Sequence, residues 1–435
     1  MKISIPTNKV IEHAGQDVMV RGFVHALRAQ SKIAFIVIRD INGTIQGVVG
    51  KESPAFDTAK SLNVESVVEI HGLAKKADQA PGGVEIEVKD IVVLSAAAPE
   101  LPIPVVTKKG GEETEAPIRF DYRWIDLRKP EKAQIFKVWT ELERGFRQYW
   151  LDNDFLQIYP PSFMNTPSET GAQVFEVKYF KGKAYLAQSP QFYKQMGIAS
   201  GFERVFMVAP VFRAEESFTT RHLTEFTGWD FEMAYIESHH DLMDTEEKML
   251  VSGFTAVKKA FPNLAIEIPT TPFPRIPMVE AKKILKERGV ESGEEHDLSP
   301  EEERAICDYV KEKHGHDFVF ITDYHKSKSA FYHMRHEEGS EHGPDRSKRA
   351  DLLYRGIEVT TLAQREHRVD ILEKQALDKG MSLEALKDYI NFFRYGCPPH
   401  GGAGIGPARL IMKMLDLPNV REATYLPRDV KRLNP

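Results

Sequence analysis

The chain has 435 residues, a formal net charge of −6, 42% hydrophobic residues and 28% charged residues. These values are typical of an ordinary globular protein with two or three domains. The charge argues against a general nucleic-acid binder but leaves room for RNA held by local basic patches. No apolar run has the length of a membrane span, no signal peptide is evident, and the two cysteines lie far apart. We therefore expect a cytoplasmic protein without membrane contact, disulfide framework or zinc site.

The first 104 residues contain short runs of alternating apolar residues that predict a small β domain. A helix is expected near residues 54–62, and Asn42-Gly43 is typical of a hairpin turn. The predicted strands cover residues 18–24, 33–39, 44–49, 64–72 and 84–94. Five strands and one helix indicate a five-stranded Greek-key barrel, the OB-fold, over residues 1–104. Such barrels bind single-stranded nucleic acids on one strand face, and aromatic side chains there stack on bases.

A proline-rich stretch at residues 101–104 marks a domain boundary, and residues 105–130 are expected to form a hinge. The arginines of the hinge could touch RNA or form internal ion pairs, and we expect internal pairs. The second domain then covers residues 131–435. It opens with a predicted helix whose apolar residues recur at helical spacing: Ile135, Trp139, Leu142, Phe146 and Tyr149. Residues 154–161 are predicted to form a short strand ended by proline.

The most informative stretch of the chain is residues 206–235. The apolar run 206–212 predicts a buried strand, and the chain returns through an antiparallel strand. On the returning strand we expect Phe226 and Trp229 on one face and Asp230 and Glu232 on the other. The hairpin would direct the polar side chains around its loop towards one surface: Arg213, Glu215, Arg221 and His222. Arginines there suit a polyphosphate, because a guanidinium offers forked, permanent donors.

Two later stretches also carry polar groups in a regular order. Residues 351–368 are predicted to form a buried strand that bears Glu358, Thr361 and Arg365. The glycine-rich residues 396–406 would let a strand approach a ligand closely, and Arg409 follows on a helix.

The region between the hairpin and these stretches is less informative. Residues 265–325 are predicted to form a mostly helical insertion. Residues 329–334 resemble the P-F-Y-x-M strand of a known family but lack its proline, so a short strand is implied there. The pair His239-His240 has no evident third metal ligand, so a metal role there has weak support. The three histidines of the next charged stretch are expected to be solvated: His333, His336 and His342.

Taken in order, these stretches resemble the motifs of the class II aminoacyl-tRNA synthetases, most closely the aspartyl, asparaginyl and lysyl subgroup. F-R-A-E at 212–215, R-H at 221–222 and D-F-E-M at 230–233 resemble motif 2. The helix and strand of residues 131–161 resemble motif 1, and the stretch ending at Arg409 resembles motif 3. The resemblance implies an α+β protein in which an OB-fold anticodon-binding barrel precedes a catalytic domain with a mainly antiparallel sheet flanked by helices. Motif 1 forms the dimer interface in this class, so a homodimer is implied.

The chain is similar to the compact, archaeal-type aspartyl-tRNA synthetases. This likeness implies ATP-dependent attachment of L-aspartate to tRNA(Asp) through an aspartyl-adenylate. The residues at the aspartate-binding positions are Glu169, Gln191, Lys194, Arg213, Thr361 and Arg365. Lys194 and Arg365 would bind the side-chain carboxylate, and Glu169 the α-ammonium. Asparaginyl enzymes generally carry an uncharged residue at the place of Lys194, because an amide leaves a cation poorly paired.

The same resemblance implies a site for ATP and Mg²⁺. The residues at ATP-binding positions are Arg213, Glu215, Arg221, His222, Leu223, Phe226, Glu358, Gly406 and Arg409. Glu358 and Thr361 would hold Mg²⁺, for which oxygen ligands are suitable. Arg213, Glu215 and Arg409 are the implied catalytic residues, and Phe226 and Arg409 would sandwich the adenine. The chain departs from the family pattern at residues 362–363, where Leu-Ala replaces smaller residues, and this departure concerns the shape of the pocket.

On the barrel, the family reads the anticodon with residues that match Phe35, Gln46 and Glu85. From the residues alone, Phe35 could equally belong to the barrel core. Family members that charge both tRNA(Asp) and tRNA(Asn) tend to carry His and Pro where this chain has His25 and Pro81. A non-discriminating enzyme is therefore implied, with an Asp-tRNA(Asn) amidotransferase as a partner in the pathway. The alternatives are an asparaginyl-tRNA synthetase and a non-catalytic RNA-binding paralogue.

Overall fold

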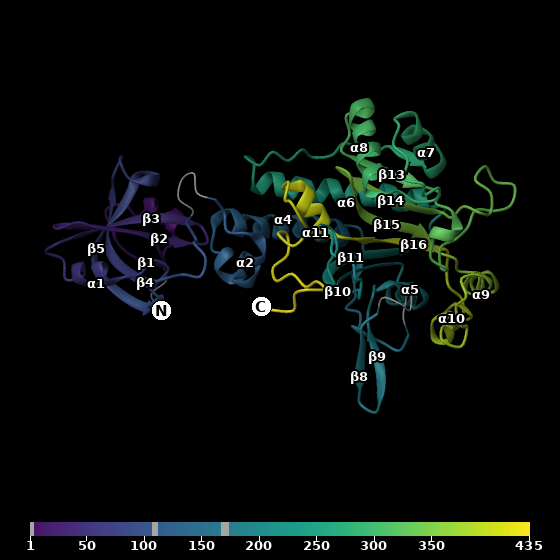
Figure 1. Ribbon diagram of the computed structural model, residues 1–435, viewed down its shortest axis with the longest axis horizontal. Coiled ribbons are helices and arrows are strands. Elements are labelled where there is room, and N and C mark those ends of the chain that lie inside the picture. The colour runs from purple at the N-terminus through teal and green to yellow at the C-terminus, as the bar shows by residue number, and fades with distance from the viewer. Residues whose placement is uncertain (1–3, 107–111, 167–173) are drawn as a thin grey trace. The chain divides into compact units, whose positions relative to one another are not determined.

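The computed structural model describes residues 4–106, 112–166 and 174–435, and the chain divides into two compact units between Gln134 and Ile135 (Figure 1). The division falls within a long helix, α4 (Pro130–Asp152). Each unit has a hydrophobic core of its own. Within the described ranges, no helix has the length and apolar character needed to span a membrane.

The first unit is a closed barrel of five strands in the order β1-β2-β3-β5-β4. Neighbouring strands are antiparallel except β3 and β5, which run parallel. The strands are β1 (Asp17–Ala29), β2 (Ile33–Asp40), β3 (Gly43–Gly50), β4 (Val67–Lys76) and β5 (Val84–Ser95). One short α-helix and two 3-10 turns complete the barrel: α1 (Phe56–Ser61), η1 (Thr7–His13) and η2 (Pro81–Gly83). The predicted OB-fold is confirmed.

Alternation along the strands produces the barrel core. In β2, the side chains of Ala34, Ile36 and Ile38 are fully buried, whereas those of Phe35 and Val37 are half-buried on the outer face. Inward aliphatic side chains from all five strands join one cluster. Burial of each Val, Leu or Ile side chain contributes about 1.5–3 kcal/mol, so this pattern stabilises one register over the register shifted by a residue.

The arginines after the barrel form internal ion pairs, as expected from the sequence. Arg119 and Arg123 contact the fully buried carboxylate of Asp126 at 3.2 and 2.6 Å. Arg128 contacts Glu65 at 3.2 Å. The three arginines belong to two short helices and the turn that follows them, α2 (Ala116–Asp121) and α3 (Arg123–Asp126), whereas Glu65 precedes β4.

The second unit is organised around an eight-stranded, mainly antiparallel sheet in the order β12-β13-β14-β15-β16-β11-β10-β6. Only the outermost pairs, β12 with β13 and β6 with β10, are parallel. The strands are β6 (Leu156–Gln157), β10 (Arg204–Phe212), β11 (Glu225–Ala234), β12 (Arg275–Pro277), β13 (Phe318–Thr322), β14 (Arg349–Tyr354), β15 (Ile357–Gln364) and β16 (His400–Ile405). A separate small sheet contains β7 (Phe163–Met164), β8 (Glu176–Tyr179) and β9 (Gly182–Leu186).

Helices surround this sheet, and α4, α6 (His239–Ala260), α7 (Met278–Glu287) and α8 (Pro300–His314) pack on it directly (Figure 1). Helices α4 and α6 contribute to the main core with β11, β15 and β16. Helices α7 and α8 pack on β13. The remaining helices are α5 (Gln191–Ala199), α9 (Val369–Asp378), α10 (Lys387–Phe393) and α11 (Pro407–Met414). The first three of these form a cluster around Phe192 and Tyr389, and α11 joins the main core.

Two expectations for the middle of the chain need correction. Residues 265–325 contain α7 and α8 but also β12 and β13, which belong to the main sheet. Residues 329–334 do not form a strand, because the 3-10 turn η3 (Lys326–Lys328) is followed by a second turn and only isolated bridges. The apolar pattern there reflects burial against other segments, since Phe331 and Tyr332 belong to the α5–α9–α10 cluster.

Helices α4 and α6 cross at very short range. A Cβ on Gly145 would lie 2.6 Å from the carbonyl oxygen of Ser252 and 2.6 Å from the Cα of Gly253. The hydroxyl of Ser252 donates a hydrogen bond of 2.8 Å to the Gly145 carbonyl. Both helices can therefore approach this closely only because each has a glycine at the crossing, Gly145 on α4 and Gly253 on α6.

We expect Gly145→Ala to destabilise the second unit by about 1–3 kcal/mol, because the backbone of α6 must move away. The intrinsic helix preference of alanine, about 1 kcal/mol, offsets only part of this cost. Guanidinium unfolding followed by tryptophan fluorescence measures the change. Gly197→Ala on α5 is the control, since its nearest neighbours are the side-chain ends of Ile158 and Val205. Equal or greater stability of Gly145→Ala would contradict the close crossing.

Candidate active site

One cavity of about 430 Å³ lies over the centre of the sheet in the second unit. Its walls come from α5, the β10–β11 hairpin, β14, β15, β16 and the start of α11. It brings together all the described residues that were expected around aspartate and ATP: Gln191, Lys194, Arg213, Glu215, Arg221, His222, Leu223, Phe226, Glu358, Thr361, Arg365, Gly406 and Arg409. Glu169 lies outside the described residues.

At one end of the cavity, two cations and two anions form a buried cluster, which we call the ion quartet: Lys194, Asp230, Glu232 and Arg365. The ammonium of Lys194 lies 2.8 Å from Asp230 and 3.4 Å from Glu232. The guanidinium of Arg365 lies 2.9 Å from Glu232. Lys194 and Arg365 also donate to the backbone carbonyls of residues 403 and 402, each at 2.9 Å. The formal charges of the quartet cancel, so the buried cluster is neutral.

Strand β11 supplies both acids of the quartet, because alternate residues share a face. The expected arrangement of this strand was wrong for one residue. Phe226 lines the cavity together with Asp230, whereas Trp229 and Phe231 are fully buried in the main core. Asp230 therefore points into the cavity with Phe226, and Glu232 lies fully buried behind it.

The neighbouring strand β16 allows the acids to lie where they do. A Cβ on Gly402 would overlap the carbonyl of Phe231 and the carboxylate of Glu232. Glycine at this position lets β16 pass directly under Glu232 while its backbone carbonyl accepts from Arg365.

The other end of the cavity is rich in arginine. The guanidinium of Arg213 lies 5.6 Å from the centre of the Phe226 ring and 3.8 Å from Glu215. Arg409 donates to the backbone carbonyl of Glu358 at 3.0 Å. Burial and the nearby Arg409 lower the pKa of His222, so its ring is neutral at physiological pH.

Arg221 has a partner that sequence analysis did not identify. One nitrogen of its guanidinium lies 2.8 and 2.6 Å from the two carboxylate oxygens of Glu303, which comes from α8. Glu303 also accepts from the backbone N–H of Glu358 at 3.3 Å. The insertion between residues 265 and 325 is thus part of the site. No local pattern indicated this contact, because 82 residues separate the two side chains.

Glu358 and Thr361 lie together on β15, where the hydroxyl donates to the carboxylate at 3.3 Å. Burial alone would raise the pKa of Glu358, but Arg409, Arg349, Arg221 and Arg213 together lower it. Asp351 is the cross-strand partner of Thr361. Burial raises the pKa of Asp351 to about 6, with Arg349 opposing the shift and Glu358 adding to it. The site thus holds two acidic groups close enough to influence one another.

Three further cavity residues were missed or misjudged: Lys328, His333 and Arg349. His333 was expected to be solvated, but its side chain is buried and burial lowers its pKa well below the usual value. His336 was also expected to be solvated, yet it is mostly buried and bonds Asp323 at 2.8 Å. His342 is half-buried beside it. The charged sequence around these histidines concealed their burial.

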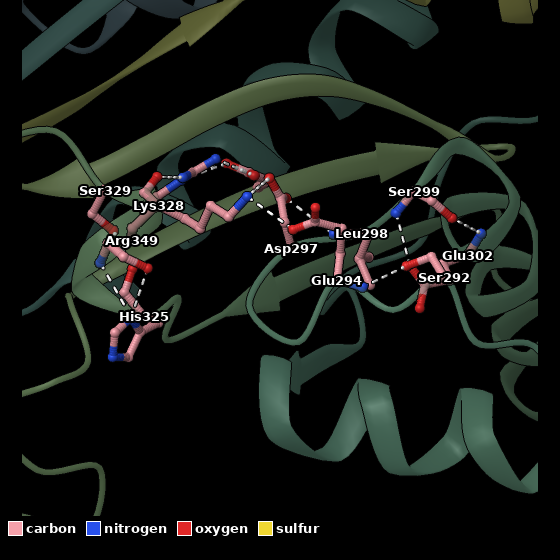
Figure 2. A network of polar contacts seen from close by, with 12 residues as sticks. Ser292, Glu294, Asp297, Leu298, Ser299, Glu302, His325, Lys328, Ser329 and Arg349 are labelled. Atoms are coloured by element: carbon pink, nitrogen blue, oxygen red, sulfur yellow. Dashed lines mark hydrogen bonds and ion pairs between the residues drawn. The ribbon is translucent and has the colours of Figure 1, made fainter.

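Lys328 and Arg349 connect this wall to the segment before α8. Figure 2 shows Lys328 reaching towards Asp297 and Glu294. Its ammonium nitrogen lies 3.0 Å from a carboxylate oxygen of Glu294 and 3.8 Å from one of Asp297. Arg349 donates to the carbonyl of Lys328. On the far side of the same segment, Glu302 caps its helix with Ser299.

On the barrel, the three residues expected at the anticodon share the outer face. Gln46 and Glu85 are register partners on β3 and β5, and the Gln46 amide donates to Glu85 at 3.1 Å. Phe35 lies on the adjacent β2 and is half-buried, so it is not a core residue.

The two residues expected to affect tRNA discrimination lie on different parts of the barrel. His25 is the residue at which the register of β1 shifts, and its Nδ1 lies 2.7 Å from Arg39. Pro81 is exposed at the start of η2.

The ion quartet predicts a pH-dependent stability. Burial alone would raise the pKa of Glu232, but Arg365 and Lys194 outweigh it and the pKa lies below 4.5. Its contribution to stability is therefore complete above pH 4.5 and is lost as the pH falls through the lower pKa of the folded state. We expect Glu232→Gln to cost about 3–5 kcal/mol at pH 7, because two buried cations lose a partner. The variant should lose less stability on acidification than the wild type.

Unfolding midpoints between pH 3 and 7 measure this difference. Glu176→Gln is the matched control, because Glu176 pairs with Lys183 on an exposed surface and should matter little at any pH. Parallel pH curves for the wild type and Glu232→Gln would contradict the assignment.

Comparisons with known proteins agree with this geometry. Residues 115–430 match the family of class II tRNA synthetases (D, K and N), and residues 18–94 match the OB-fold nucleic acid binding domain. The aspartate–tRNA(Asp/Asn) ligase of Aeropyrum pernix is 40% identical, with 97% of this chain and 96% of that protein covered. The aspartate–tRNA(Asp) ligase of Thermococcus kodakarensis is 38% identical, with 97% of each chain covered.

A solved structure is also similar. The asparaginyl-tRNA synthetase of Pyrococcus horikoshii with bound asparaginyl-adenylate superimposes with a TM-score of 0.91 at 33% identity, over the full length of both chains. The fold of each unit agrees with the family model that matches it. The chain belongs to the class II aminoacyl-tRNA synthetases, in the subgroup that includes the aspartyl, lysyl and asparaginyl enzymes.

Proposed function

We propose that this protein attaches L-aspartate to tRNA(Asp) and also to tRNA(Asn), using ATP and an aspartyl-adenylate intermediate. The observation that carries the proposal is the shared cavity, which Lys194, Arg365 and Arg213 all line, with Lys194 and Arg365 both in contact with Glu232. Similar proteins named aspartate–tRNA(Asp/Asn) ligase, in Aeropyrum pernix and Thermus thermophilus, support it at 40% identity over nearly the whole chain.

The ion quartet accounts for a preference for aspartate over asparagine. Arg365 uses two of its nitrogens on Glu232 and the carbonyl of Gly402, which leaves Nη1 for a ligand. A carboxylate can accept from this nitrogen and from the adjacent Lys194 at once. An amide presents donors of its own to these cations and would leave them poorly paired. This contrast disfavours the asparaginyl alternative, even though an asparaginyl enzyme has a closely similar fold.

At the arginine-rich end, the chain binds and orients ATP. Phe226 and Arg409 face the cavity and would hold the adenine between them, with Glu215 near its amino group. Arg213 would contact the α-phosphate and the α-carboxylate of aspartate, while Arg221 and His222 would contact the outer phosphates. The carboxylate attacks the α-phosphorus in line, and pyrophosphate leaves. The 3′-hydroxyl of the terminal adenosine of the tRNA then attacks the carbonyl carbon, and AMP leaves. The residues act by positioning and charge, so no side-chain base is required.

Residues present at the site suit Mg²⁺. No group of three or more metal-binding side chains occurs in the described parts of the chain. Mg²⁺ is usually held by one or two carboxylates together with phosphate oxygens and water, and it neutralises charge on the phosphates when bound. Glu358 and Thr361 would supply the protein ligands. Burial raises the pKa of the neighbouring Asp351 to about 6, and the carboxylate of Glu358 adds to this shift, so a cation at this place would relieve the repulsion between the two acids.

The barrel would read the anticodon. The aromatic face of Phe35 and the polar groups of Gln46 and Glu85 lie on one outer surface, which suits stacking and hydrogen bonding to unpaired bases. His25 and Pro81 would leave the pocket for the third anticodon base tolerant of both C and U. An Asp-tRNA(Asn) amidotransferase would then consume the mischarged product, and a cytoplasmic location follows from this role.

A homodimer completes the proposal. The motif 1 region exposes Leu151, Leu156 and Tyr159, with 56%, 53% and 78% of their surfaces accessible. Strand β6, which carries Leu156, is an edge of the main sheet. A second copy that covers this edge would bury these apolar groups and pair the strand.

Charging of tRNA transcripts with radiolabelled aspartate tests the function. We expect product on both tRNA(Asp) and tRNA(Asn), and none on an unrelated tRNA. The double variant His25→Trp, Pro81→Lys should lose at least about ten-fold in charging of tRNA(Asn), because one mismatched base contact is typically worth 1–3 kcal/mol. It should keep most of its activity on tRNA(Asp). If the wild type charges tRNA(Asp) alone, tRNA(Asn) is not a substrate. If it charges neither tRNA, the proposed function is refuted.

Substitution of Leu156 by Asp tests the dimer. A buried, unpaired charge at the interface should shift the protein to a monomer in sedimentation experiments. Leu377→Asp is the matched control, since Leu377 is similarly exposed at 57% but lies on α9. A wild type that sediments as a monomer, or an unchanged dimer in Leu156→Asp, would contradict this interface.

A further inference from the structure

A line of buried hydrogen bonds runs behind the cavity from the backbone carbonyl of Pro398 to Gln191. It passes through His400 and Gln195, both of which are inaccessible to solvent. Gln191 itself is 5% exposed and lines the cavity. None of these buried groups belongs to the ion quartet or to the phosphate end, so their arrangement has another role.

The direction of each hydrogen bond in this line follows from its first member. A backbone carbonyl can only accept, so Nδ1 of His400, 2.8 Å from the Pro398 oxygen, carries a proton. The sulfur of Cys397 is a weaker and more distant neighbour at 3.7 Å. Burial lowers the pKa of His400 to about 4, so the ring is neutral at pH 7 and its Nε2 is an acceptor.

The two glutamine amides are then oriented in turn. The amide of Gln195 lies 3.0 Å from Nε2 of His400 and must present its nitrogen there. Its oxygen accepts from the hydroxyl of Tyr389 at 2.9 Å and from Nε2 of Gln191 at 3.0 Å. This bond holds one N–H of Gln191, which fixes the orientation of the amide and leaves its carbonyl oxygen available to the cavity.

A carbonyl oxygen at this place discriminates between the groups of an amino acid. Gln191 precedes Lys194 by one helical turn, so it lies beside the ion quartet. At neutral pH aspartate has one hydrogen-bond donor, the α-ammonium, and its two carboxylates only accept. The oriented oxygen can therefore bond the ammonium, whereas a reversed amide would offer its N–H groups to a carboxylate and repel the ammonium.

We propose that His400 and Gln195 are positioning residues, which hold the Gln191 amide so that its oxygen receives the α-ammonium of the amino-acid substrate. This inference rests on the proposed function, because it requires an amino acid at this end of the cavity. In this role, the buried hydrogen bonds of His400 and Gln195 select one of the two orientations of the Gln191 amide.

Aspartate-dependent pyrophosphate exchange, with succinate as a competitive inhibitor, tests the inference. Succinate is aspartate without the ammonium, so it reports on the carboxylate contacts alone. Gln195→Met keeps the size of the side chain but frees the Gln191 amide. We expect the KM for aspartate to rise about 10- to 100-fold, as for loss of a hydrogen bond to a charged group. The KM for ATP and the Ki of succinate should change less than about two-fold.

A second variant guards against misfolding of the first. His400→Asn keeps a donor for the Pro398 carbonyl but removes the acceptor for Gln195. It should therefore also raise the KM for aspartate more than the Ki of succinate. His400→Gln restores an acceptor near the place of Nε2 and should recover part of the loss. Gln375→Met is the matched control, because Gln375 is a buried glutamine that bonds the carbonyls of Phe331 and His333 instead. Its ratio of aspartate KM to succinate Ki should stay at the wild-type value.

The outcomes separate the inference from the function on which it rests. If the variants raise the KM for aspartate and the Ki of succinate equally, or leave the KM for aspartate unchanged, the orienting role is overturned. A wild type without aspartate-dependent exchange would refute the proposed function, and the inference with it.

Discussion

The active site of this protein depends on the ion quartet of Lys194, Asp230, Glu232 and Arg365. Burial of a single charge costs several kcal/mol, and one pair seldom recovers that cost. Two cations and two anions, completed by backbone carbonyls of β16, leave no net charge in the interior. The quartet ties α5, β11 and the end of β15 to one another, so the geometry of the amino-acid end is set by the same contacts that stabilise the sheet.

The two ends of the cavity use charge in different ways. The quartet is neutral, so it attracts no anion over long range and selects a ligand by the geometry of short contacts. At the other end, Arg213, Arg221 and Arg409 surround Glu358 and are more accessible to solvent. Such a cluster attracts a polyanion from a distance, and the ligand supplies the charge that the arginines lack. This division suits a site where one ligand is a polyphosphate and the other a small zwitterion with an extra carboxylate.

Segments outside the three motifs contribute more to the site than their sequences indicate. Glu303 from α8 holds Arg221, and the segment before α8 reaches Lys328 on the cavity wall (Figure 2). Behind the amino-acid end, His400 and Gln195 set the direction of a hydrogen-bonded line. In each case a residue outside the lining of the cavity holds a cavity residue in place.

The sequence by itself determined the barrel, the main hairpin and most of the polar lining of the cavity, but not Lys328, His333 and Arg349. Period-two alternation located the five barrel strands, an apolar run located β10, and a helical stripe located α4. The order of the polar motifs identified the cavity residues from Gln191 to Arg409, with Glu169 outside the described residues. The prediction for Phe226 was wrong, because alternate residues of β11 share a face and Phe226 therefore lies on the cavity side with Asp230.

Only the tertiary structure decided the partners of the charged groups. Nothing near Arg221 in the chain indicates Glu303, and nothing near Lys194 indicates Asp230, 36 residues away. The burial of His333 was hidden for the same reason, since its charged neighbours in sequence are not its neighbours in space. A local pattern records the period of the backbone and the side that faces the core. The partner of a buried charge depends on which distant segment folds against it, and this requires the whole packed sheet.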